Sequence, residues 1–389
     1  MGSAVGGTAL PLVALVGLQA STFEVALLAA VAWLPWLLVG LPAGAWVDRL
    51  PKRPVMAVCN TVSMAVFASV PLAQLAGVLS VPYLLGVALA AGTAKVFFSL
   101  AYRSYLPVLV EREQLLAANT RLQGSESAAQ VGGPGLAGVL AAVFGPVSGI
   151  LADAVSFGVS ALCLRAIRQR EPKPAVTQRV RLRTQVADGL RFVAGDRYLW
   201  TLVAFGAVSN LALNGYASIQ VVFLARDLHA GPGTIGLVLA VSEVGGVVGA
   251  LLIGRLATRF GTARTFLLCE AFAAPAMLIG PADGLVCFVI AGVAVSAGLV
   301  GSNVVAGAFR QGYCPPELFG RITACSAVVN YGTIPLGGLL GGILGQTLGV
   351  RETMLVMGAV QLAALAIPVF SPLRPLRDFP QRQGERDLV

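Results

Sequence analysis

The chain has 389 residues, of which 57% are hydrophobic and 12% charged, and its mean hydropathy is +0.82. A water-soluble protein of this length needs a more highly charged surface, so the composition excludes an ordinary soluble globular protein. The net charge of +9 is compatible with nucleic-acid binding. Most of the basic residues lie in loops on one side of the apolar segments, however, and this distribution argues against a nucleic-acid partner.

Apolar segments of roughly 20 residues follow one another along the chain, each long enough to cross a bilayer core. Because irregular backbone cannot face lipid, each is predicted to be a transmembrane helix. The twelve predicted spans are approximately 3–20, 24–47, 55–77, 81–102, 126–144, 147–167, 199–223, 234–254, 265–281, 284–308, 322–346 and 351–371. The first has no polar lead and is rich in glycine, so we expect either a short helix or one that begins inside a longer ancestral helix.

The lysines and arginines predict how the chain is oriented. All but three of the 27 lie on the side of the membrane that holds residues 44–53 and the C-terminal tail. The exceptions are Arg226, Arg351 and Lys95, the last of which lies within the span 81–102. Positive charge marks the cytoplasmic side. We therefore predict a multi-pass protein of the cell membrane with a cytoplasmic C-terminus.

The longest polar stretch, residues 165–198, divides the predicted spans six and six. It is basic, and its residues 178–193 carry a narrow apolar face, which is typical of a helix on the inner membrane surface. The predicted domains are an N-terminal six-helix bundle at 1–164, a cytoplasmic basic linker at 165–198, a C-terminal six-helix bundle at 199–371 and a cytoplasmic tail at 372–389.

Two sequence features recur at half-chain spacing. The charged loop 44–53 (GAWVDRLPKR) returns, degraded, as 254–264 (GRLATRFGTAR). Residues 101–138, which run from Ala-Tyr-Arg to a Gly-Pro-Gly element, resemble residues 308–338. Because each half holds six spans, the two repeats have the same orientation. Parallel repeats of this kind are a known plan of transporters.

With this loop, this repeat and this span pattern, the whole chain resembles the major facilitator superfamily. Residues 44–53 match its signature between the second and third helices, with Pro51 where glycine is usual. Tyr105-Leu-Pro107, Ala118-Asn119 and Gly133-Pro134-x-x-x-Gly138 resemble the bacterial exporter branch that includes siderophore and macrolide efflux proteins. The resemblance implies an all-α membrane fold with twelve transmembrane helices in two parallel-repeat six-helix bundles.

The resemblance also implies a secondary active transporter that exports a drug, a siderophore or a secondary metabolite by alternating access. Many proton-coupled members carry an arginine in the fourth helix, where this chain has Ala88 and Gly92. Proton antiport is therefore left open. The alternatives are a transporter-like protein that senses or no longer transports, and an importer of a small solute. The sequence names neither the substrate nor the coupling ion.

The charged loop is predicted to gate the cytoplasmic side. A carboxylate at Asp48 can cap a neighbouring helix end and pair with arginine, and contacts of this kind can be made in one state and broken in the other. The alternative is that the cations of the loop only set the topology. The predicted gating residues are Gly44, Asp48, Arg49, Lys52, Arg53 and Arg259.

The fifth span carries Gly133, Pro134 and Gly138, which resemble the antiporter-like motif of the superfamily. Proline removes a backbone hydrogen bond, and glycines allow two helices to approach closely. The span 322–346 repeats this chemistry around Pro335. Close packing and bending during alternating access are both consistent with the pattern.

Polar groups at membrane depth are the candidates for binding a substrate or a proton. Glu243 is the clearest, since it lies near the middle of its span. Asp153 is expected at the outer interface, and Glu126 and Glu270 near the inner surface. The candidates for the substrate or proton site are Glu243, Lys95, Asn210, Asn214 and Asn330.

The sequence offers little for catalysis. It has one histidine, His229, in a predicted outer loop, and six scattered cysteines without a Cys-x-x-Cys pair. It has no Gly-x-x-x-x-Gly-Lys-Ser/Thr loop for ATP. We therefore expect no enzyme activity, no cofactor, no metal and no nucleic-acid partner. The expected partners are a small-molecule substrate, protons as a candidate coupling ion, and the lipid bilayer around a monomer.

Overall fold

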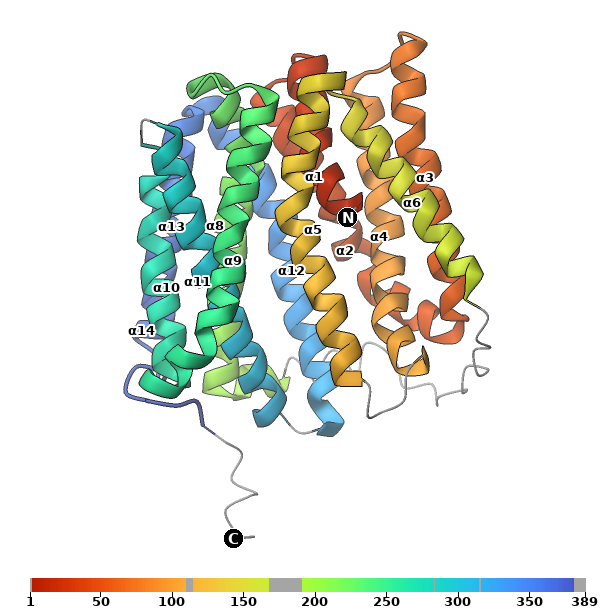
Figure 1. Cartoon of the computed structure of the whole chain (residues 1–389). Helices are drawn as coiled ribbons and strands as arrows, with labels where there is room; N and C mark the ends of the chain where they lie inside the picture. Colours follow the sequence, from red (N-terminus) through yellow and green to blue (C-terminus); the bar gives the residue numbers. More distant parts are fainter. Residues whose placement is uncertain (1, 110–114, 168–190, 283, 315, 381–389) are drawn as a thin grey trace. The chain divides into compact units, whose positions relative to one another are not determined.

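The computed structural model describes residues 2–109, 115–167, 191–282, 284–314 and 316–380, and this described part is built from helices (Figure 1). The helices of the first half are α1 (Gly2–Leu12) with the π-helical turn η1 (Val13–Gly17), α2 (Thr22–Arg49), α3 (Lys52–Leu75), α4 (Val81–Leu109), α5 (Leu115–Phe144) and α6 (Ser148–Ala166). Those of the second half are α8 (Arg197–Val222) with the π-helical turn η3 (Phe223–Asp227), α9 (Pro232–Phe260), α10 (Thr262–Ile279), α11 (Leu285–Tyr313), α12 (Pro316–Thr347), α13 (Val350–Ala364) and α14 (Ala366–Val369).

Each predicted span falls on one of these helices, on a helix and its adjoining turn or, for 351–371, on the two consecutive helices α13 and α14. Among the described residues, nine helices are long and apolar enough to cross a membrane, and Gly6–Gly17 and Ala128–Phe144 are shorter apolar helices. The first helix, α1, continues directly into the π-helical turn η1. Most of the predicted linker helix, residues 168–190, lies outside the described residues, but residues 191–195 are helical.

The half-chain repeat is visible in the backbone. The turns η1 and η3 are separated by the same number of residues as the loop 44–53 and its second copy. Each turn is followed by a residue in the left-handed conformation, Gln19 (φ 53°) after η1 and His229 (φ 52°) after η3. Both positions disfavour ordinary side chains. The lone histidine is therefore an exposed element of a repeated turn, which agrees with the expected loop position.

The described chain forms two compact units. Unit 1 comprises Met1–Arg179, Ala217–Ala240 and Gly338–Val350, and unit 2 comprises Val180–Tyr216, Val241–Gly337 and Arg351–Val389. Unit 1 thus contains α1–α6 together with one end each of α8, α9 and α12. The boundaries of the predicted bundles at 1–164 and 199–371 do not follow this division, and those bundles remain a prediction.

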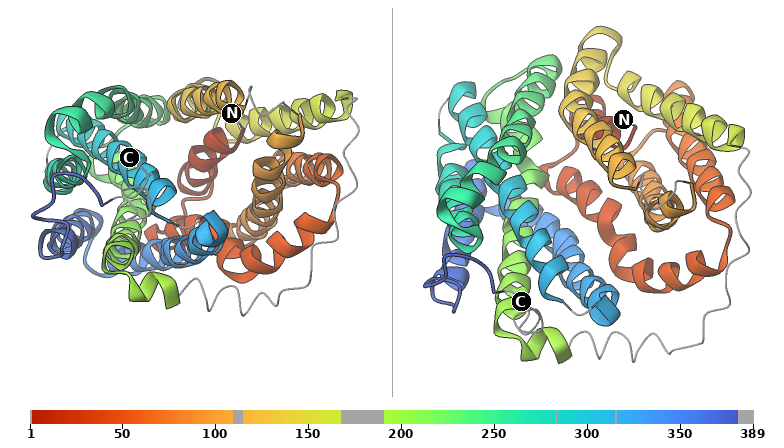
Figure 2. Two further views of the ribbon diagram at one scale, coloured as in Figure 1. Left: turned by 90° about the horizontal axis from the view of Figure 1, so that it is seen from below. Right: turned by 60° about the horizontal axis from the view of Figure 1, so that its bottom comes forward.

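Within unit 1, α3 packs against α4 and α6, α1 packs against α5 and α6, and α2 packs against α4 (Figure 2). Glycines bring some of these helices into close contact. Gly92 of α4 lies against the carbonyl group of Ala32 in α2, and Gly149 of α6 lies against Ala9 in α1. Small residues of this kind are the usual means by which membrane helices approach closely.

Within unit 2, α10 packs along α11, and the segment after α14 packs on both helices. Phe379 stacks on Phe309 with ring centroids 4.5 Å apart, and Leu373 is fully buried. The Thr262 N–H at the start of α10 donates to Oδ1 of Asp378 over 2.8 Å. The first part of the predicted tail, up to residue 380, therefore caps and covers a helix end.

Candidate functional site

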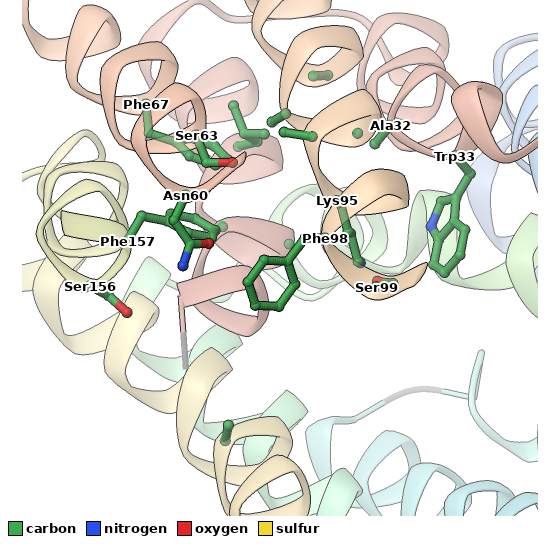
Figure 3. Close-up of a pocket in the computed structure, with 18 of the residues that line it drawn as sticks. Ala32, Trp33, Asn60, Ser63, Phe67, Lys95, Phe98, Ser99, Ser156 and Phe157 are labelled. Atoms are coloured by element: carbon green, nitrogen blue, oxygen red, sulfur yellow. The ribbon is translucent and has the colours of Figure 1, made fainter. Parts of the chain in front are cut away.

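A cavity of about 910 Å³ lies within unit 1, lined by α1–α6 (Figure 3). This volume is at the upper end of the range for small-molecule sites, about 300–1,000 Å³. The wall combines aliphatic and aromatic side chains with a set of polar ones, a lining that suits a small organic molecule. The aromatic and polar lining residues are Trp33, Asn60, Ser63, Phe67, Lys95, Phe98, Ser99, Tyr102, Gln130, Ser156, Phe157 and Ser160.

Lys95 supplies a cation to this cavity. It stands on α4, its side chain is exposed to the space, and its Nζ lies 4.8 Å from the ring centroid of Trp33 on α2. An ammonium group over an indole face is a favourable cation–π contact. The close approach of Gly92 to Ala32, one turn away, holds α4 against the helix that carries Trp33. The cation that the sequence singles out at membrane depth therefore faces a binding-sized space.

The polar wall opposite is held by a hydrogen bond between two helices. Nδ2 of Asn60 on α3 donates to Oγ of Ser160 on α6 over 2.7 Å, and both residues line the cavity. The Asn60 side chain is almost fully buried. Neither residue stands out in the sequence, because a single amide or hydroxyl group in an apolar span is common.

The expectation that Asp153 lies at the membrane interface is wrong. Its side chain is fully buried, and its carboxylate lies against Gly6 of α1, where a Cβ would collide with it. Among the described residues, neither carboxylate oxygen has a hydrogen-bond partner. Position along a helix does not reveal which face packs inward. The stripe of Asp153, Ser156 and Ser160 at helical spacing was the available signal for a polar inner face.

The inner-surface expectation for Glu270 is also wrong. Its side chain is 2% exposed, and Nε2 of Gln361 on α13 donates to its Oε2 over 3.4 Å. Because α10 begins at Thr262, Glu270 lies two turns inside the helix on the face that packs against its neighbours. The side chain of Glu126 lies outside the described part of the chain.

The predicted gating residues are only partly described. Gly44 and Asp48 fall in the last turns of α2, and their side-chain environment is outside the described residues. Arg49 is exposed, and Nζ of Lys52 donates to the carbonyl oxygen of Val47. The guanidinium of Arg259 is 5.4 Å from the ring centroid of Phe260.

Arg53 has a distinct position in this loop. Its Nε donates to the carbonyl oxygen of Leu164 over 2.7 Å, and its Nη2 donates to that of Arg165 over 2.6 Å. These carbonyls belong to the last turn of α6, where the helix leaves them without intrahelical donors. A cation at a helix C-terminus also interacts favourably with the helix dipole. Arg53 therefore caps α6.

The fifth-helix motif lies at a helix crossing in unit 1. Gly138 of α5 is buried against Gly236 of α9, and the carbonyl oxygen of Pro134 also faces Gly236. Gly133 is buried on the same helix. In unit 2, Gly337 lies against the backbone of Leu211 in α8, so the second copy of the motif also allows close contact.

In unit 2 the structure brings two of the predicted polar candidates together. Nδ2 of Asn210 on α8 donates to Oδ1 of Asn330 on α12 over 3.2 Å, and Nδ2 of Asn214 donates to the carbonyl oxygen of Asn210 over 2.8 Å. Glu243 on α9 is exposed, and its Oε2 accepts from Oγ of Ser296 over 3.3 Å. Glu243 is not among the residues that line the cavity of unit 1.

Within the described ranges, no group of three histidine, cysteine or acidic side chains is placed to hold a metal ion. What the site offers is a partly aromatic cavity with a cation, hydrogen-bonding groups on its wall and the buried carboxylate of Asp153 behind it. Such an arrangement can bind an amphipathic organic molecule.

Comparison with known proteins agrees with this interpretation. Multidrug efflux pump Tap of Mycobacterium tuberculosis is 28% identical over 389 residues, which cover 95% of this chain and 90% of that protein. Macrolide efflux protein A of Streptococcus pyogenes is 20% identical and covers 92% and 89% of the two chains.

Solved structures share the fold. A mutant of the nucleoside transporter NupG superposes with a TM-score of 0.77 at 12% identity, over 94% of this chain and 96% of that one. A bacterial homologue of the iron transporter ferroportin in an inward-facing state gives 0.72 at 20% identity, over 94% and 95%. The predicted all-α membrane fold with twelve helices is confirmed.

A family model described as "Transmembrane secretion effector" matches residues 9–385, nearly the whole chain. The predicted resemblance to the exporter branch is confirmed by this match and by the two efflux proteins. The chain belongs to the transmembrane secretion effector family of the major facilitator superfamily.

Proposed function

We propose that this protein exports small organic molecules across the cell membrane by alternating access and binds them in the cavity of unit 1. The observation that carries the proposal is the cavity of about 910 Å³ with its aromatic wall and its single lysine. The names of the two efflux proteins to which the chain is similar, a multidrug pump and a macrolide pump, support the same direction of transport.

The chemistry of the wall suggests which molecules bind. Trp33, Phe98 and Phe157 offer stacking surfaces, and Asn60 and Ser160 offer hydrogen bonds. Lys95 places a positive charge in the cavity, so a neutral or acidic compound is favoured there over a cation. A charge at membrane depth is expensive to keep, which favours a functional role for this one.

Alternating access requires a gate at each side of the membrane. We place the cytoplasmic gate at the loop around Asp48 and the outer gate at two contacts of unit 1. One is the crossing of Gly138 with Gly236. The other is Arg226, whose guanidinium donates to the carbonyl oxygen of Ala20 over 2.7 Å and to Oγ1 of Thr22 over 3.3 Å.

The cytoplasmic C-terminus, the monomeric state and proton coupling are part of this proposal. The distribution of lysine and arginine supports the orientation. The internal repeat supports a monomer, because one chain already contains both halves that alternating access needs. Support for proton coupling comes from the buried carboxyl groups of Asp153 and Glu270.

The proposal is tested by efflux from cells of a strain that lacks its major exporters and makes this protein. Four probes cover the charge range: chloramphenicol (neutral), nalidixic acid (acidic), erythromycin (a macrolide) and ethidium (cationic). We expect faster loss of at least one probe than from cells with an empty vector. If wild-type protein that is inserted in the membrane moves none of the probes, the sensor alternative is favoured, and if it raises their accumulation, the importer alternative is favoured.

A further inference from the structure

Unit 2 contains a buried polar group, which we call the Glu270 cluster: Glu270 on α10, Ser302 on α11 and Gln361 on α13. Each of the three side chains is 2% exposed. Gln361 Nε2 donates to Glu270 Oε2 over 3.4 Å, and the Ser302 hydroxyl donates to the carbonyl oxygen of Leu299 over 3.1 Å. The carboxyl group thus lies at membrane depth between side chains of two other helices.

Among the described side chains, no charged group offsets the Glu270 carboxylate. In the part of the chain that the structure describes, Glu270 has no lysine or arginine as an ion-pair partner, and the polar groups that face it from the packed helices are Ser302 and Gln361. The other titratable group beside it is the thiol of Cys269. An ionised carboxylate without a cation in such a place is strongly disfavoured.

The hydrogen-bond inventory of the cluster has an unused acceptor. Within the described residues, Gln361 Oε1 is buried and has no donor. The Ser302 hydroxyl is within reach of both the Leu299 carbonyl oxygen and the Glu270 carboxyl group, so the unused acceptor of the cluster is Gln361 Oε1. An ionised Glu270 carboxylate has only hydrogen-bond acceptors and cannot supply a donor to Gln361 Oε1. A protonated carboxyl group supplies the missing donor, and the cluster is therefore built for a neutral acid.

The internal repeat has the same site in the first half. The spacing from Arg49 to Asn60 equals the spacing from Arg259 to Glu270, so Asn60 corresponds to Glu270. The spacing from Pro134 to Ser160 equals the spacing from Pro335 to Gln361, so Ser160 corresponds to Gln361. The structure joins both pairs across equivalent helices, through the Asn60–Ser160 bond and the Gln361–Glu270 bond.

The third position separates the two copies by charge. The spacing from Lys95 to Arg103 equals the spacing from Ser302 to Arg310, so Lys95 corresponds to Ser302 in the repeat. The first copy therefore holds a cation and lines a cavity, and the second copy holds a carboxyl group and is closed off from solvent. The two copies are suited to different ligands, an organic molecule in the first and a proton in the second.

We propose that Glu270 is the proton-binding residue that couples export to the proton gradient, with Ser302 and Gln361 as positioning residues. The inference rests on the proposed export function. In the state described here the carboxyl group holds a proton and offers its O–H as the hydrogen-bond donor that Oε1 of Gln361 lacks. When the transport cycle admits water from the cytoplasm, the proton leaves, and a proton from outside replaces it as the substrate departs.

Proton binding can be tested without any substrate. Infrared difference spectra of the purified protein in liposomes, recorded across a pH titration, show the carbonyl band of protonated carboxyl groups. We expect a titrating band in the wild type that is lost in Glu270→Gln and kept in Glu352→Gln, which changes an exposed glutamate of the same unit. If Glu270→Gln fails to insert, Gln361→Leu is used, and it should shift the midpoint of the band. An unchanged titration in the inserted variant overturns the proposal.

Coupling is then tested with whichever of the four probes the wild type moves. In Glu270→Gln liposomes, exchange of labelled for unlabelled probe at equal pH should stay within about twofold of the wild type, and accumulation driven by a pH gradient should fall at least tenfold. Accumulation driven by a sodium gradient at equal pH, or full pH-driven accumulation by the variant, overturns the assignment. If the wild type moves no probe, export has failed, and the infrared result still decides whether Glu270 binds a proton.

Discussion

A Cβ atom built on Gly138 would lie 2.7 Å from the Cα of Gly236, and one built on Gly236 would lie 2.6 Å from the Cα of Gly138. Real Cβ atoms essentially never come so near another carbon, so the two helices touch through their backbones. This contact joins α5, from the first half of the sequence, to α9, from the second. It lies toward the predicted outer ends of both helices, where export requires the two halves to separate.

Gly138→Val should therefore disturb this crossing. Overpacking costs about 1–3 kcal/mol, and here it destabilises the state in which the crossing is closed. We expect export of the transported probe to fall by about tenfold or more, with insertion intact. The matched control is Gly132→Val on the same helix, since a Cβ at Gly132 meets nothing within 4 Å. Equal rates for the two variants would show that the crossing has no part in the cycle.

Arg226 provides a second contact at the same side. Its bonds to Ala20 and Thr22 connect η3 with the turn before α2 and with the first residue of α2. Arg226→Gln should weaken outer closure by about 1–3 kcal/mol, because hydrogen bonds from a charged group are the stronger kind. The readout is labelling of a cysteine introduced at the exposed residue Gln19, with Arg226→Lys as the partial rescue. If the Arg226→Gln variant is labelled at the wild-type rate, this contact is not part of the outer gate.

Lys95 is expected to set the charge preference of the cavity. Lys95→Met keeps the length of the side chain and removes the charge, so binding of nalidixic acid should weaken about tenfold relative to ethidium. Trp33→Leu, which removes only the ring beside the ammonium group, should weaken all four probes without changing their order. Fluorescence-quenching titrations of the purified protein give both results, and an unchanged order in Lys95→Met would contradict the role.

Asp48 is expected to act in the cytoplasmic gate. Asp48→Asn should lower turnover with insertion intact, because it removes one charge from the closed gate. Arg53→Gln should instead lower the melting temperature, since it leaves the last carbonyls of α6 without their cap. Transport at the wild-type rate by inserted Asp48→Asn would return the loop to a role in topology alone.

Glu243 remains a predicted site for basic substrates. Glu243→Gln keeps the shape of the side chain and its bond to Ser296, so stability should change little. Efflux of ethidium should fall about tenfold while efflux of chloramphenicol stays unchanged, if the carboxylate meets the substrate charge. Equal ethidium efflux by the variant and the wild type at several pH values would remove Glu243 from the site.

Most of the fold could be predicted from the sequence because the membrane imposes it. An apolar segment of bilayer length has to be a helix, and the loop 44–53 with its second copy marks the repeat. Hydropathy does not predict the backbone conformation at the end of a helix. The π-helical turns η1 and η3, with the left-handed Gln19 and His229 behind them, depend on backbone contacts that a hydropathy pattern does not encode.

The sequence predicts that polar groups at membrane depth form a site, but it does not predict which of them line the cavity. Lys95 and Glu243 stood out because charges are rare within spans, yet only Lys95 lines the described cavity. Asp153 and Glu270 were expected at the interfaces because they lie nearer the ends of their spans. Their burial depends on which face of the helix packs inward, and position along the helix does not give this face.

The most direct test of the account is transport into inside-out membrane vesicles from cells that make the protein. Under an imposed proton gradient, acidic inside, export from the cell becomes uptake into the vesicle. We expect at least one of the four probes to accumulate above the level in vesicles without the protein, and we expect the accumulation to collapse when an ionophore dissipates the gradient. No accumulation of any probe, or accumulation only in right-side-out vesicles, would contradict export by this chain.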